Sequence, residues 1–117
     1  MNFNFDIAKT SNAMLQAALP ALSKGGQKAS SFASHEFQQY IINLQHIQTM
    51  AEEGKITPEE ARFLVNQYKL SMQAVLLAVE GLGVISVQQA INAAIDVLNN
   101  ALNTALGTAF KSIKFAI

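Results

Sequence analysis

The sequence predicts an all-α protein, an antiparallel helical bundle of three long helices preceded by a short N-terminal helix. Apolar residues recur at spacings of three and four over three long stretches, which places them on one face of a helix. Short segments with glycine and helix-capping residues separate the stretches, which favours antiparallel neighbours. We expect a single domain, with residues 1–22 as an N-terminal segment, 23–31 as a linker and 31–117 as the three-helix bundle.

The composition favours a folded protein with an unusually neutral surface. Of the 117 residues, 50% are hydrophobic and only 14% are charged, and the formal net charge is zero. Soluble domains usually carry about 25% charged residues. This balance excludes a disordered chain and the basic surface that nucleic-acid binding needs. Weak charge repulsion between copies favours association.

Targeting signals give little further information. The chain has no cysteine, and therefore no disulfide framework. Its first residues lack the basic start and continuous apolar core of a secretory signal, since Asp6 and Lys9 interrupt them. The default expectation is a cytoplasmic protein. Residues 70–87 are apolar enough to suggest a membrane span, but Glu80 would be costly at the centre of a bilayer.

The N-terminal segment predicts one short helix. Apolar residues follow an i, i+4 pattern from Ala13 onward, and Pro20 disfavours helical geometry at Leu19. The helix is therefore expected to end near Leu19. The following SKGGQKASS, residues 23–31, is expected to form a flexible loop.

The first long helix is predicted from residue 31 to 53. Its buried face is formed by Ala33, Phe37, Tyr40, Leu44, Ile47 and Ala51. Gly54 follows as a terminator. Thr57-Pro58-Glu59-Glu60 then combines a cap, a proline at the first helical position and a glutamate that completes a capping box. A reversal into the next helix is expected here.

Two further helices are predicted, from Pro58 to about Glu80 and from Val87 to about Lys114. The first has a face of Ala61, Val65, Tyr68, Met72, Val75 and Val79. The second has a face of Ile91, Ile95, Leu98, Leu102, Ala105 and Ala109. Gly81-Leu82-Gly83 is expected to end one helix, and Ser86 to Gln89 to open the next with a second capping box.

Surplus hydrophobicity points to contacts outside a three-helix core. Residues 74–79 are apolar all round, and the last helix has a second line of small or β-branched residues that would let another helix approach closely. The predicted self-association residues are Leu76, Leu77, Leu82, Ala90, Ala94, Val97, Ala101, Thr104 and Thr108.

The polar side of the last helix allows two interpretations. Its members are Asn92, Asp96, Asn99 and Asn103. A solvated helix face is the ordinary interpretation. The alternative is a hydrogen-bonded seam between subunits or the lining of an assembled pore.

No catalytic or metal-binding set is predicted. His35 and His46 lie about four turns, or roughly 16 Å, apart on a helix, so they cannot share an ion within one chain. Glu80 directly follows the apolar residues 74–79, but no nucleophile or base lies at a spacing that would form a catalytic set with it. We expect a chain that is not an enzyme and has no cofactor.

The function expected first is that of a non-enzymatic, self-associating helical protein, a structural or assembly subunit that forms a homo-oligomer. The alternative is a membrane-active protein, pore-forming or holin-like, that inserts residues 58–114 as a helical hairpin. Its motivation is the low charge and the alanine-rich line of that half of the chain. Nucleic acid is not expected as a partner.

Overall fold

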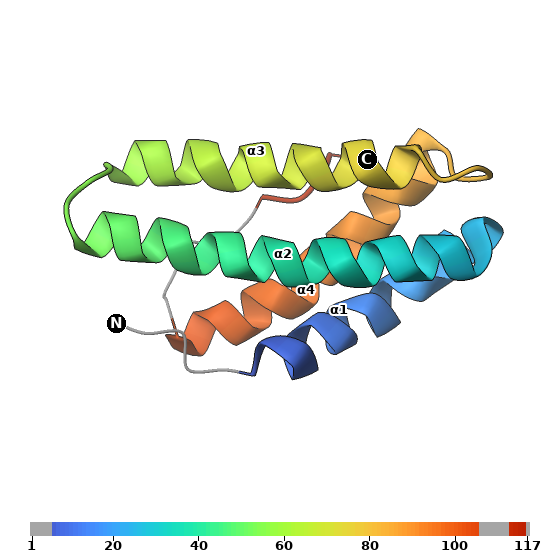
Figure 1. Cartoon of the computed structure of the whole chain (residues 1–117), viewed down its shortest axis with the longest axis horizontal. Helices are drawn as coiled ribbons and strands as arrows, with labels where there is room; N and C mark the ends of the chain where they lie inside the picture. Colours follow the sequence, from blue (N-terminus) through green and yellow to red (C-terminus); the bar gives the residue numbers. More distant parts are fainter. Residues whose placement is uncertain (1–5, 106–112, 117) are drawn as a thin grey trace.

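The computed structural model describes residues 6–105 and 113–116, with side chains for 6–101 and 113–116 (Figure 1). The elements in chain order are α1 (Ile7–Leu22), the short 3-10 helix η1 (Ser23–Gly25), α2 (Gly26–Glu52), α3 (Pro58–Leu77) and α4 (Val84–Ala105). The described part of the chain contains no strand. The prediction of an all-α helical bundle is confirmed.

The helices form two antiparallel pairs that cross each other. Figure 1 shows α2 and α3 side by side, while α1 and α4 form a second pair that runs obliquely to the first. Each helix runs opposite to the one before it, as predicted for up-and-down topology.

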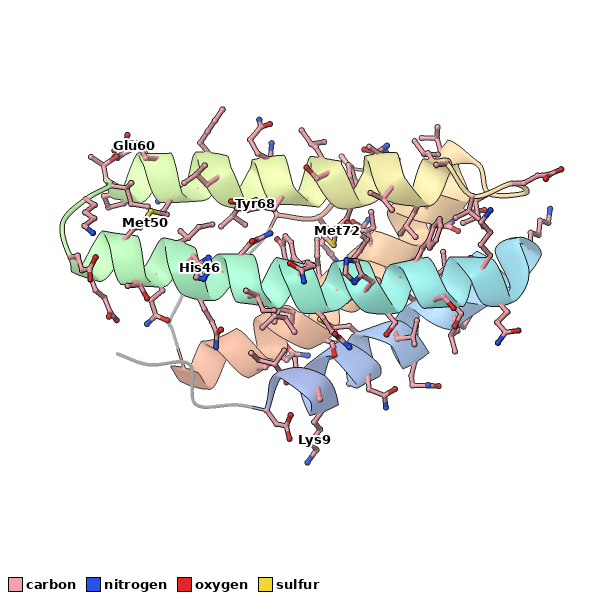
Figure 2. All side chains as sticks on the ribbon, viewed as in Figure 1. Lys9, His46, Met50, Glu60, Tyr68 and Met72 are labelled. Carbon is pink, nitrogen blue, oxygen red and sulfur yellow. The ribbon has the colours of Figure 1, made fainter. Side chains whose placement is uncertain are left out.

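The predicted helix faces form the core. The fully buried large side chains include Phe37, Tyr40, Leu44, Ile47, Met72, Leu76, Ile91, Ile95 and Leu98. Met50 from α2 and Tyr68 and Met72 from α3 lie between these two helices (Figure 2). The spacing of three and four therefore identified most of the buried face of α2 and, at Ile91, Ile95 and Leu98, that of α4. On α3 the prediction was partly wrong, because Tyr68 and Val75 are half-buried while Lys69 and Leu76 are buried. The side chains of Leu102, Ala105 and Ala109 lie outside the described residues.

The turn between α2 and α3 also matches the prediction. The backbone N–H of Thr57 donates to Oε1 of Glu60 over 2.8 Å, and the backbone N–H of Glu60 donates to Oγ1 of Thr57 over 3.1 Å. The two side chains thus satisfy two amides that a helix start leaves without a partner. Pro58 occupies the start of α3, where its missing N–H is harmless.

The N-terminal helix differs from the prediction, because α1 continues through Pro20 to Leu22. Asp6 caps its start by accepting from the backbone N–H of Lys9. Met14, Ala18 and Leu22 are buried in the core. Burial of Leu22 outweighs the single backbone hydrogen bond that proline cannot donate in the last turn. The helix is an integral layer of the bundle.

The predicted linker over residues 23–31 is also corrected. Only η1 separates α1 from α2, and residues 26–31 already belong to α2. The chain reverses at Gly26, whose φ of 65° is a conformation that glycine adopts without strain. Ala29 is fully buried in the core. The sequence analysis missed the burial of Ala29 because most of the surrounding residues are polar or glycine.

Both boundaries of the turn between α3 and α4 lie three residues earlier in the chain than predicted. α3 ends at Leu77 instead of Glu80, and α4 begins at Val84, so Ser86 lies inside α4 and the second predicted capping box is wrong. The turn between them packs closely against η1, since a Cβ atom on Gly81 would lie 2.7 Å from the Lys24 carbonyl oxygen. Gly81 itself has a φ of 95°. Tertiary contact with η1 therefore helps set this turn.

Candidate interaction surfaces

The first residues of the small-residue line of α4 lie inside the fold of the single chain. Ala90 and Ala94 have no exposed surface, and the same holds for Leu76 of α3, so these three cannot form a contact surface on the folded chain. The helix that packs most extensively against α4 in the described chain is α1, a pairing that the sequence did not predict. Small side chains admit a close helix, and here that helix belongs to the same chain.

The other predicted self-association residues divide into two groups. Leu77, Leu82 and Val97 are half-buried and pack against the core, and Ala101 is half-buried. The side chain of Thr104 and the whole of Thr108 lie outside the described residues. Of the predicted set, Leu77, Leu82, Val97 and Ala101 are the described side chains that remain accessible to a partner.

An exposed apolar face on α3 was missed by the sequence analysis. Phe63 is 62% exposed, and Leu70, seven residues later, is also exposed. With half-buried Leu77 they repeat every seven residues, which places them along one side of α3. We call Phe63, Leu70 and Leu77 the α3 apolar face. Their seven-residue spacing is visible in the sequence. The sequence analysis assigned only the more extensive apolar pattern, that of the buried face, to this helix.

The start of α4 adds two more exposed aliphatic residues. Val84 and Ile85, which we call the corner pair, are 50% and 57% exposed. Within residues 63–95, all of which the structure describes, the charged residues are Lys69 and Glu80, and only Glu80 is exposed. Leu70, Leu77 and the corner pair therefore have few charged neighbours along the chain, whereas Phe63 follows the exposed residues Glu59, Glu60 and Arg62.

Residues 113–116 return to α3 and α4 and are not helical, which corrects the prediction of a helix continuing to Lys114 (Figure 1). Asn92 of α4 holds the backbone of Phe115 at two points. Its Nδ2 donates to the Phe115 carbonyl oxygen over 2.9 Å, and its Oδ1 accepts from the Phe115 N–H over 2.7 Å. One side-chain amide thus satisfies both polar groups of one residue.

Lys69 of α3 is buried beneath this segment, with only 5% of its surface exposed. Its Nζ donates to the Ile113 carbonyl oxygen over 2.7 Å and lies 4.4 Å from the centroid of the Phe115 ring. Burial lowers the pKa of Lys69 below its ordinary value of 10.5. The ring and the carbonyl oxygen replace part of the water that the ammonium group has lost.

Asp96 completes the contacts of the segment. Its Oδ1 lies 3.0 Å from Nζ of Lys114 in an exposed ion pair. We call Lys69, Asn92 and Asp96 the C-terminal docking site. Two of the four residues predicted as a polar seam between subunits thus bind their own chain, while Asn99 is half-buried and the side chain of Asn103 lies outside the described residues.

Replacing Lys69 by methionine should change how stability depends on pH. Because the pKa is lowered in the folded chain, the unfolded chain binds more protons between that lowered pKa and 10.5. The free energy of unfolding of the wild type, measured relative to Lys69→Met, should therefore rise as pH increases through this window. Urea unfolding at pH 7 and pH 10, followed by circular dichroism, checks the sign. If the difference in free energy of unfolding between the wild type and Lys69→Met stays constant or falls as pH rises, the burial of a charged Lys69 is contradicted.

The side chains considered for chemistry do not converge. His35, His46 and Glu80 are exposed. The described residues contain no group of three or more histidine, aspartate or glutamate side chains placed to hold a metal ion. Over residues 6–105 and 113–116, no helix combines the length and hydrophobicity needed to cross a membrane.

Comparison with protein-family models, with curated proteins and with solved structures finds no match to this chain.

Proposed function

We propose that this chain is a non-enzymatic, self-associating subunit that contacts a second copy through the α3 apolar face and the corner pair. The observation that supports this most strongly is the exposure of Phe63, which is 62% accessible to water. Between Phe63 and the end of α3, the structure exposes no charged side chain. Large apolar side chains grouped on one surface commonly mark interaction sites.

The energetics favour a contact of this kind. Full burial of a phenylalanine, leucine or isoleucine side chain contributes about 1.5–3 kcal/mol. Phe63, Leu70 and Ile85 are all large and accessible. Association has to offset lost translational and rotational freedom, and several such side chains acting together are needed for that. Neutral surroundings help, because few charged groups would lose their water in the interface.

The proposal is tested by Phe63→Glu combined with Leu70→Glu. Placing two carboxylates on the α3 apolar face should weaken association at least about 100-fold, because two apolar contacts are replaced by charges that resist burial. Sedimentation velocity over a range of concentrations measures the change. Circular dichroism should show unchanged helix content, since both positions are exposed in the folded chain.

The matched control is Asn12→Glu, which adds a charge at an exposed position of α1. It should associate as the wild type does. A wild type that stays monomeric at every concentration would reject the proposal. Normal association of the double variant would show that the α3 apolar face is not the contact surface. Vesicle flotation of the wild type examines the alternative prediction, insertion of residues 58–114 into a membrane, and recovery of the protein with the vesicles would favour that alternative.

A further inference from the structure

The contacts that hold residues 113–116 are those of a peptide-binding site. Asn92 pairs with both the N–H and the C=O of Phe115, which is how an extended backbone is held when no neighbouring strand is present. These two hydrogen bonds position the segment, whatever its side chains are.

The flanking contacts add selectivity for particular side chains. Nζ of Lys69 lies 4.4 Å from the centroid of the Phe115 ring, which suits an aromatic residue at that position. Asp96 pairs with the preceding Lys114. The site is therefore complementary to an extended segment in which a lysine precedes an aromatic residue.

The docked segment is attached by one half-buried ring and a few polar contacts. Phe115 packs against the core, whereas Ile113 is 75% exposed. The hydrogen bonds and the exposed ion pair each contribute little net free energy in water. Release costs correspondingly little, because the polar groups of Asn92 and Asp96 then bind water instead. All the contacts are between side chains of α3 or α4 and residues 113–116, so the same contacts can form between two copies.

We infer that Lys69, Asn92 and Asp96 form a binding site for an extended lysine-aromatic segment, and that in the assembly residues 113–116 of a second copy occupy it. This inference rests on the proposed function, since contact through the α3 apolar face first brings the copies together. Proximity then raises the effective concentration of the second copy's segment. Exchange of an identical element requires no new complementarity, because each site receives the partner for which it is already shaped.

Complementation between two damaged copies tests the inference. Asn92→Ala removes both hydrogen bonds from the site but leaves the segment intact. Phe115→Pro removes the donated N–H and the ring but leaves the site intact. Each variant alone should associate about as the wild type does, because a contact exchanged between copies replaces the same contact within one chain, and each variant has lost it in both states. An equimolar mixture should associate about tenfold more tightly than either variant alone, since the free working site of one copy takes the free working segment of the other.

Sedimentation velocity of the wild type, the two variants and the mixture gives the result. Ile113→Ala is the matched control, because it changes the exposed side chain of the segment and keeps the carbonyl oxygen that accepts from Lys69. If either variant loses helix content, Asp96→Lys and Lys114→Glu form an alternative pair with complementary charges. A mixture no tighter than its components would overturn the inference and leave the proposed function standing. Absence of association in the wild type would reject both.

A peptide experiment measures the site directly. A fluorescent peptide containing residues 113–116 should bind the full-length Phe115→Pro chain, whose own segment no longer competes well. Adding Asn92→Ala to that chain should weaken the binding about tenfold. Fluorescence anisotropy that shows no binding, or equal binding to both chains, would overturn the assignment of the site.

Discussion

Truncation of Met14 to alanine is expected to lower the free energy of unfolding by about 2–5 kcal/mol. Met14 lies in the middle of α1 and has no exposed surface. Removal of its side chain leaves a cavity between helices that cannot all move inward. Since domains are stable by only about 5–15 kcal/mol, this loss is a large part of the total. Urea unfolding followed by circular dichroism measures it.

Asn12→Ala is the control for this prediction, because Asn12 is exposed on the same helix. Its effect should stay within about 0.5 kcal/mol. The comparison distinguishes an integral α1 from a peripheral one. If α1 were peripheral, Met14→Ala would release that helix and leave the main unfolding transition of α2, α3 and α4 at the same urea concentration.

Enlarging Ala94 to leucine should destabilise the chain by about 1–3 kcal/mol. Ala94 is fully buried in the single chain. It lies on α4, the helix against which α1 packs most extensively. The added carbon atoms have no space and would force α1 and α4 apart. The expected result is a lower unfolding midpoint in thermal and urea denaturation.

The size of the oligomer separates the two possible roles of this small-residue line. If Ala94 faced a second subunit, Ala94→Leu would yield a dissociated chain of wild-type stability. Ala13→Leu makes the same change at an exposed position of α1, and it should leave stability within about 0.5 kcal/mol of the wild type. Thermal denaturation and sedimentation velocity of both variants decide the question together.

The helix faces and one turn were predictable because they depend on residues close together in the chain. Apolar residues three and four positions apart share a helix face, so most buried positions of α2, several of α3 and the first ones of α4 followed from spacing. The Thr57 to Glu60 box needs only four consecutive residues. Two of the errors, at Pro20 and at residues 23–31, arose where local rules favoured a break and tertiary burial kept the chain helical.

The docking site was beyond sequence reasoning. Lys69 is absent from the predicted buried face of its helix, and it is buried where Ile113 and Phe115, which lie far along the chain, contact it. The separation between Lys69 and Ile113 is 44 residues. No periodic pattern within α3 indicates such a contact. Asn92 and Asp96 were identified as an unusual polar set, but their partner in the same chain was not.

The sequence by itself determined the all-α class, the core-facing positions of the long helices, the reversal before α3 and the low surface charge. These properties follow from composition and from neighbours within one or two turns of helix. Only the tertiary structure decided which apolar surplus is internal and which is exposed. Packing of the other helices against α4 buries Ala90 and Ala94, whereas no helix of the described chain covers Phe63. Exposure depends on which distant segment packs where, and spacing along one helix does not contain that information.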